Sequence, residues 1–99
     1  MEKYQFHIET YTMPVGCTSW ITANRFPHLT DEEQVYGIFQ GMVKEVGRDY
    51  PHARLARSLH HRTVEQAFRD RESSICSREW VLSPKDGKYR VTMYVTKAA

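Results

Sequence analysis

Alternation of apolar and polar side chains at both ends of the chain is the feature that most limits the folds open to it. Residues 3–12 and 89–96 each alternate with a period of two. This period is typical of a strand with one buried face. The apolar positions are Tyr4, Phe6, Ile8, Tyr89, Val91, Met93 and Val95.

Turn residues beside these strands predict a hairpin at each end. Residues 13–16 (MPVG) form a turn and lead into a second strand at 17–22, which is rich in β-branched and aromatic residues. The segment 23–28 is predicted to be a loop. At the other end, a strand at 75–82 and a turn at 83–87 precede the last strand.

Residues 31–48 are predicted to form the first helix. Thr30 and Glu33 have the spacing of a capping box, in which the Thr30 side chain would bond the amide of Glu33. Acidic residues crowd the first turn, where the helix dipole favours negative charge. An apolar stripe at helical spacing consists of Val35, Ile38, Phe39, Met42 and Val46.

A second helix is predicted to begin near Pro51, because proline suits the first turn of a helix. Thr63 and Gln66 have the spacing of another capping box, which predicts a break near 60–62 and a short helix at 64–72. The alternative is one continuous, kinked helix. Helical spacing would place Ala53, Ala56, Leu59 and His60 on one face, and Arg54, Arg57, Ser58 and His61 on the opposite face.

The predicted fold is therefore a single α+β domain over residues 1–99. Its element order is β-β-α-α-β-β, giving a four-stranded antiparallel sheet with two or three helices packed on one face. The other face of the sheet is expected to show His7, Glu9, Arg90, Thr92 and Tyr94, with a tryptophan as a further candidate.

Composition excludes several classes of protein. The chain is 40% hydrophobic and 26% charged, as in an ordinary globular protein rather than a disordered one. It has no run of about 18 apolar residues, and its N-terminus has no signal-peptide pattern, so a cytoplasmic location is expected. Cys17 and Cys76 are predicted to be free, half-buried thiols in strands. Neither cysteine nor histidine spacing predicts a metal site, and no motif predicts a cofactor.

Positive charge is concentrated between Arg48 and Arg62, a segment that contains four arginines and one acidic residue, Asp49. An arginine-rich helix face suits phosphate or carboxylate, because a guanidinium donates two parallel hydrogen bonds. The alternative is a solvated helix face without a ligand. Gly37 and Gly41 add a smooth strip on the first helix, opposite its apolar stripe. This strip predicts close approach of another backbone, and the alternative is packing against the second helix.

The sequence contains no motif for a phosphate loop, a serine nucleophile or a zinc protease. It therefore predicts a non-enzymatic binding protein that docks on a larger protein or nucleoprotein machine and regulates or inhibits it. Phage and mobile-element products that antagonise host defence often have this size, so such an inhibitor is part of the hypothesis. The predicted partner-binding residues are Gly37, Gln40, Gly41, Lys44, Arg48, Arg54, Arg57, His61 and Arg62. The alternative is nucleic-acid binding through the basic helix, including metal-independent RNA cleavage with His61 as acid or base.

Overall fold

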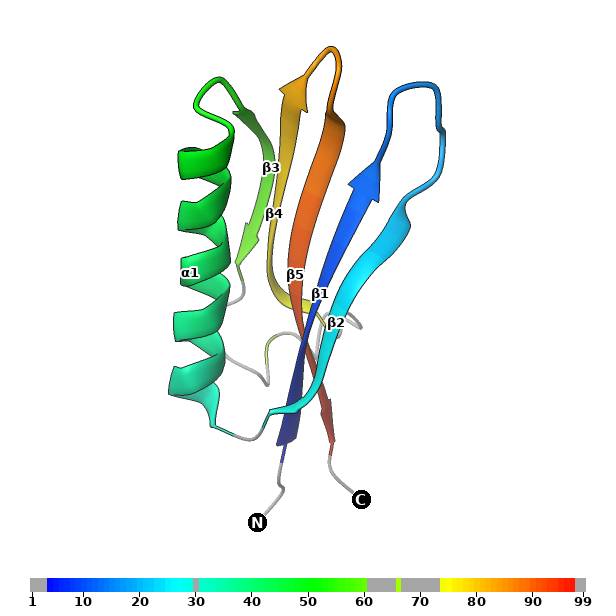
Figure 1. Ribbon diagram of the computed structural model, residues 1–99. Helices are drawn as coiled ribbons and strands as arrows, with labels where there is room; N and C mark the ends of the chain where they lie inside the picture. Colours follow the sequence, from blue (N-terminus) through cyan, green and yellow to red (C-terminus); the bar gives the residue numbers. More distant parts are fainter. Residues whose placement is uncertain (1–3, 30, 61–65, 67–73, 98–99) are drawn as a thin grey trace.

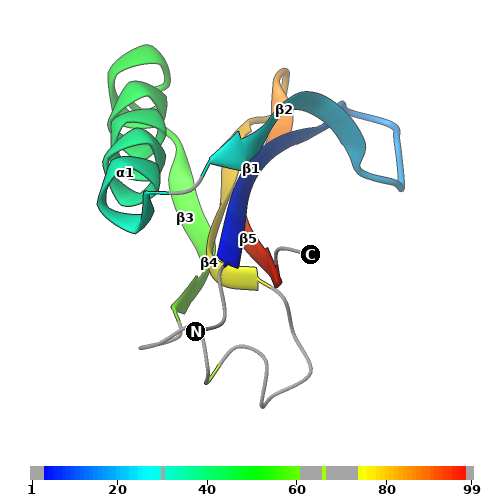
Figure 2. The ribbon, with the colours of Figure 1, turned by 90° about the horizontal axis from the view of Figure 1, so that it is seen from below.

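The computed structural model describes residues 4–29, 31–60, 66 and 74–97. The elements follow the order β1 (Tyr4–Met13), β2 (Ile21–Leu29), α1 (Glu32–Asp49), β3 (Arg54–His60), β4 (Ser74–Ser83) and β5 (Gly87–Lys97). The strands form one antiparallel sheet in the order β2-β1-β5-β4-β3 (Figure 1). Helix α1 lies on one side of this sheet, as the view from below shows (Figure 2).

The α+β class and the antiparallel sheet are confirmed, but the predicted number of elements is wrong. The sheet has five strands instead of four, and the described residues contain one helix instead of two or three. The segment predicted to be the second helix, or part of one kinked helix, contains strand β3. Its backbone pairs with β4, and this pairing outweighs the local spacing of alanine and leucine. The helix predicted at 64–72 lies outside the described residues, apart from Gln66.

The second strand is also longer and later than predicted. Strand β2 covers Ile21–Leu29, including residues expected to form a loop, while Cys17 and Trp20 precede it. The segment predicted to be a loop contains Pro27, which has no amide to donate to a neighbouring strand. In the sheet, β2 is an edge strand that pairs with β1 alone. An edge position tolerates proline, since an amide on its outer side has no neighbouring strand to bond.

Helix α1 matches the predicted range within one residue, although its cap differs. Asp31 is the N-cap, and its Oδ1 atom accepts hydrogen bonds from the amides of Glu33 (3.0 Å) and Gln34 (3.3 Å). Thr30, the predicted cap, lies outside the described residues. Carboxylate capping is favourable here because it also opposes the positive end of the helix dipole. Within the described part of the chain, no helix is long and apolar enough to cross a membrane.

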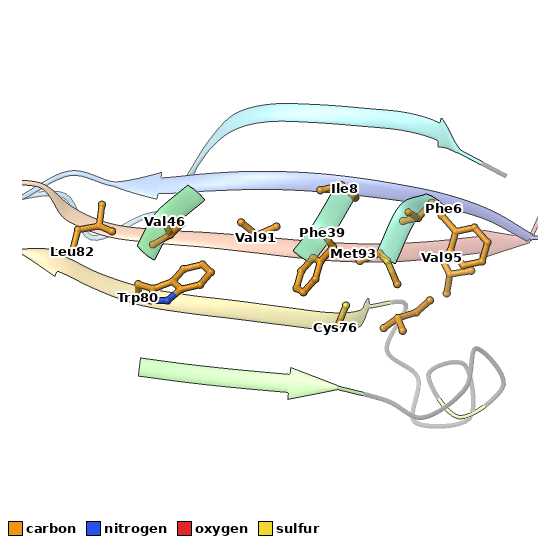
Figure 3. Close-up of a cluster of buried hydrophobic side chains, with 12 residues drawn as sticks. Phe6, Ile8, Phe39, Val46, Cys76, Trp80, Leu82, Val91, Met93 and Val95 are labelled. Atoms are coloured by element: carbon orange, nitrogen blue, oxygen red, sulfur yellow. The ribbon is translucent and has the colours of Figure 1, made fainter. Parts of the chain in front are cut away.

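The core lies between α1 and the sheet (Figure 3). Strands β1 and β5 bury the alternating positions that the sequence predicted, and α1 contributes Val35, Phe39 and Val46. Arg78 is a charged residue on this side of the sheet. Its guanidinium is 5.7 Å from the centre of the Phe39 ring and donates hydrogen bonds to the carbonyls of Leu59 and Ser77. The charge is thereby hydrogen-bonded at the edge of the core instead of being buried unpaired.

The turn before β5 gives a first prediction. Gly87 has φ +79°, and a Cβ atom added there would collide with the carbonyl oxygen of Met13. Gly87→Ala is therefore expected to lower the free energy of unfolding by about 2–4 kcal/mol, measured by urea denaturation. Gly16→Ala is the matched control, because Gly16 has φ +89° but no atom within 4 Å of the added Cβ. If the two variants lose the same free energy of unfolding, the collision of the added Cβ atom at residue 87 is contradicted.

Candidate functional site on the open face of the sheet

The face of the sheet opposite α1, here called the open face, carries an ordered set of polar side chains. The pairs Phe6–Val95 and Ile8–Met93 face the core, so the intervening pairs His7–Tyr94 and Glu9–Thr92 face the opposite way. Arg90 is paired with Tyr11 in the same manner. This confirms the predicted outward positions. Trp20 joins this face from the loop before β2, whereas Trp80 is in the core.

A chain of hydrogen bonds crosses three strands of the open face. Arg25 on β2 pairs with Glu9 on β1, with 2.7 Å between Arg25 Nε and Glu9 Oε1. The Tyr11 hydroxyl donates its single proton to Glu9 Oε2. The Tyr94 hydroxyl, 2.9 Å from that of Tyr11, must then be the donor in their contact. Burial, followed by the hydrogen bonds with Glu9 and Tyr94, raises the pKa of Tyr11 above its ordinary value.

Arg90 is held between two aromatic rings. Its guanidinium carbon lies 4.5 Å from the centre of the Tyr11 ring and 4.6 Å from that of Trp20. Both distances are within the range of favourable cation–π contacts. The Nε atom is buried and has no hydrogen-bond partner among the described residues. The rings therefore hold the guanidinium in a fixed position on the open face.

Next to Arg90 the open face is hollowed over β3, β4 and β5. The hollow has a volume of about 180 Å³. Arg57, Glu79 and Arg90 form one row across the three strands, and the Ser77 and Thr92 hydroxyls, 3.0 Å apart, form the next row. No ion pair joins Glu79 to a described residue. The lining residues are Arg57, Leu59, Ser74, Ser77, Glu79, Arg90, Thr92 and Tyr94. The hollow thus offers guanidinium, carboxylate and hydroxyl groups together.

Charge differs between the two sides of the described structure. The strand positions facing the open side carry five basic and two acidic residues, namely Arg25, Arg54, Arg57, Lys88 and Arg90 against Glu9 and Glu79. Helix α1 with its N-cap carries the opposite excess, namely Asp31, Glu32, Glu33, Glu45 and Asp49 against Lys44 and Arg48. A partner with negative charge is therefore attracted to the open face more than to the helix.

The predicted partner-binding residues do not form one surface. Gly37, Gln40, Gly41, Lys44 and Arg48 are exposed on α1. A Cβ atom added to either glycine would have no atom within 4 Å, so neither packs against another described segment. Arg54 and Arg57 are exposed on β3, at positions that face the open side, away from α1. Both face that side because the register shifts between Leu55 and Arg57, whereas Ser58, the next member of the predicted arc, pairs with Arg78 on the side of α1. His61 and Arg62 lie outside the described residues.

Arg25, Ser77 and Glu79 are part of the site, although the sequence did not single them out. Three consecutive polar residues, 77–79, lie between the buried Cys76 and Trp80, so the signal for Ser77 and Glu79 was only their odd spacing from these two residues. No pattern in the sequence indicated Arg25, because residues 23–28 were predicted to form a loop. Its pairing with Glu9 depends on the strand order, which brings β2 beside β1.

The two cysteines have different environments. Cys17 is an exposed free thiol outside the strands, contrary to its predicted half-buried strand position, and Cys76 is a fully buried free thiol in β4. Burial raises the pKa of Cys76 from 9.0 to about 12, with Arg78 acting weakly in the opposite direction.

This shift predicts a loss of stability at alkaline pH. Between pH 9.0 and about 12 the unfolded chain releases the Cys76 proton and the folded chain retains it. The contribution of this thiol to the free energy of unfolding therefore falls as the pH rises through this range, by up to about 1.4 kcal/mol per pH unit. The tyrosines with raised pKa values, Tyr11, Tyr36 and Tyr89, add to the fall in wild type and in the Cys76 variant alike. Urea denaturation of wild type and Cys76→Ala at several pH values is the measurement. An equally steep pH dependence in Cys76→Ala would contradict the assignment to this thiol.

Together, the fold and the site define an α+β protein with one antiparallel sheet, a helix on one face and an ordered polar surface on the other. Comparisons of the chain with protein families, with curated proteins and with solved structures find no match. Among the described residues, no three or more His, Cys, Asp or Glu side chains are grouped so that they could hold a metal ion.

Proposed function

We propose that this protein is a non-enzymatic binding protein that docks, through the open face of its sheet, on a larger protein or nucleoprotein machine and regulates or inhibits it. The observation that carries the proposal is the ordered polar surface opposite α1. Hydrogen bonds and ring contacts hold Glu9, Tyr11 and Arg90 in place before any partner binds. Pre-organised groups of this kind lose little conformational entropy on binding, which favours affinity.

The mixture of charges supports a protein as the partner. The open face is basic overall, but Glu79 lies in the hollow between the Arg57 and Arg90 positions of its row. A nucleic-acid backbone would bring phosphates against this carboxylate, which is unfavourable. A protein surface can present an acidic group to each arginine and a hydrogen-bond donor to Glu79, and such complementarity gives specificity.

The test compares two charge-reversal variants. Arg54→Glu/Arg57→Glu reverses charge on the open face, and Lys44→Glu/Arg48→Glu reverses it on α1; all four residues are exposed. The tagged proteins are used for affinity capture from lysates of the cells in which the protein acts, with quantitative mass spectrometry. We expect the Arg54→Glu/Arg57→Glu variant, here called the β3 variant, to reduce the captured amount of a partner by about tenfold or more. The reason is that this variant loses two charge contacts at the interface. Loss in the α1 variant alone would contradict docking through the open face.

RNA binding, with metal-independent cleavage, is the second candidate, and the row Arg57–Glu79–Arg90 favours it. A carboxylate can act as a general base while guanidinium groups stabilise charge on a phosphate. Salt-sensitive binding of an RNA oligonucleotide, together with cleavage in EDTA that Glu79→Gln abolishes, would favour this function over protein docking. If neither the wild type nor the β3 variant retards RNA in an electrophoretic-mobility assay, RNA binding is excluded as the function.

A further inference from the structure

Strand β3 is an exposed edge of the sheet. It pairs with β4 on one side, and it is the last strand in the sheet order. Six of its seven residues are exposed, and Leu59 is half-buried. The amides and carbonyls on the outer side of β3 have no partner strand among the described residues. Such an edge is a template for a further strand from another chain.

The side chains of β3 differ on its two sides. Leu55 pairs with Trp80, which is in the core, so Leu55 lies on the α1 side of the sheet; it is 55% exposed. Arg57 pairs with Glu79 and lines the hollow on the open face. An added strand would therefore meet an apolar group on one side and a guanidinium on the other. Leu55 and Arg57 are two residues apart and lie on opposite faces because the register shifts between them. A regular added strand alternates its side chains between the two faces, so its matching sequence alternates apolar with acidic residues.

A second copy of the chain fits this edge poorly. Arg57 is the central residue of β3, so symmetric antiparallel pairing of two copies over the full length of the strand would place the two Arg57 side chains opposite each other. Like charges that are directly opposed destabilise a strand pair. An acidic residue opposite Arg57 would stabilise it instead.

We infer that β3 accepts an extended segment of the partner protein as a sixth strand, with acidic residues toward the open face and apolar residues toward α1. This inference rests on the proposed docking function and specifies the partner's segment. Backbone hydrogen bonds along β3 would supply affinity, and the contacts with Arg57 and Leu55 would supply register and selectivity.

The test uses the whole protein and capped, fluorescein-labelled peptides of eight residues. The first peptide alternates Glu and Val, the second alternates Lys and Val, and the third is the Glu/Val peptide N-methylated at every residue. Fluorescence polarisation gives the affinities, and amide chemical shifts locate the bound peptide. We expect the Glu/Val peptide to bind at least about fivefold more tightly than the Lys/Val peptide. N-methylation should abolish binding, and the shifts should centre on residues 54–60.

Charge reversal supplies the matched control. Arg57→Glu should reverse the preference toward the Lys/Val peptide, while Lys44→Glu on α1 should leave it unchanged. Undiminished binding of the N-methylated peptide would overturn strand addition, because that peptide cannot donate backbone hydrogen bonds. If no peptide binds, but capture of the partner still depends on Arg54 and Arg57, strand addition is overturned and the proposed docking stands. Binding of a single-stranded oligonucleotide at β3, without peptide binding, would overturn both.

Discussion

Phe39→Ala is expected to lower the free energy of unfolding by about 3–5 kcal/mol, as for other buried phenylalanines. Phe39 is 3% exposed and is one of three buried side chains through which α1 packs on the sheet. Its ring also lies under the guanidinium of Arg78. Truncation would leave a cavity beneath the helix and remove this ring contact. Urea denaturation followed by far-ultraviolet circular dichroism measures the loss.

Leu55→Ala is the matched control for this prediction. Leu55 is 55% exposed at the sheet edge, so its truncation should change the free energy of unfolding by no more than about 0.5 kcal/mol. Small domains are stable by only about 5–15 kcal/mol, so Phe39→Leu provides a milder variant if the alanine variant does not fold. A loss below about 1 kcal/mol for Phe39→Ala would contradict the packing of α1 on the sheet.

Arg90→Ala is expected to loosen the open face and to lower the free energy of unfolding by about 1–3 kcal/mol. The guanidinium lies between the rings of Tyr11 and Trp20, and its removal would expose both rings to water. The emission of Trp20 should therefore shift to longer wavelength. The measurement uses a Trp80→Phe background, in which Trp20 is the single tryptophan of the chain.

Arg90→Lys separates the charge of this residue from its shape. Lysine keeps the positive charge but lacks the planar group that stacks between two rings, so it should recover only part of the stability lost in the alanine variant. An unchanged Trp20 emission in Arg90→Ala would contradict the ring contacts. Full recovery by lysine would show that charge, and not stacking, stabilises this part of the open face.

The distribution of charge changes how the basic segment of the sequence is interpreted. Arg48 and Arg54 are close in the sequence, but Arg48 is on α1 and Arg54 is on the strand that follows. The turn between them reverses the chain, and the sheet then separates the two side chains. Variants that combine residues of both surfaces would therefore mix two possible interfaces. Variants confined to one surface can distinguish them.

Local pattern was sufficient to predict the elements whose apolar residues repeat in step with their burial. Helix α1 has a complete apolar stripe, and the strands at the two ends alternate over residues 4–9 and 89–96, so each could be placed from its own residues. The outward set on β1 and β5 followed from the same alternation. These segments are buried on one face, and burial imposes a periodic pattern on a sequence.

The two edge strands, and with them the site, depend on pairing between segments that are distant in the sequence. Residues 54–60 have leucines four apart, as in a helix, while residues 21–29 contain a proline and several polar residues. Both segments are mostly exposed, so burial imposes no period on them, and pairing with β4 and β1 makes them strands. Their backbone hydrogen bonds come from neighbours distant in sequence, which local patterns do not reveal. For this reason the sequence identified Arg57, whereas the sheet placed it in one row with Glu79 and Arg90.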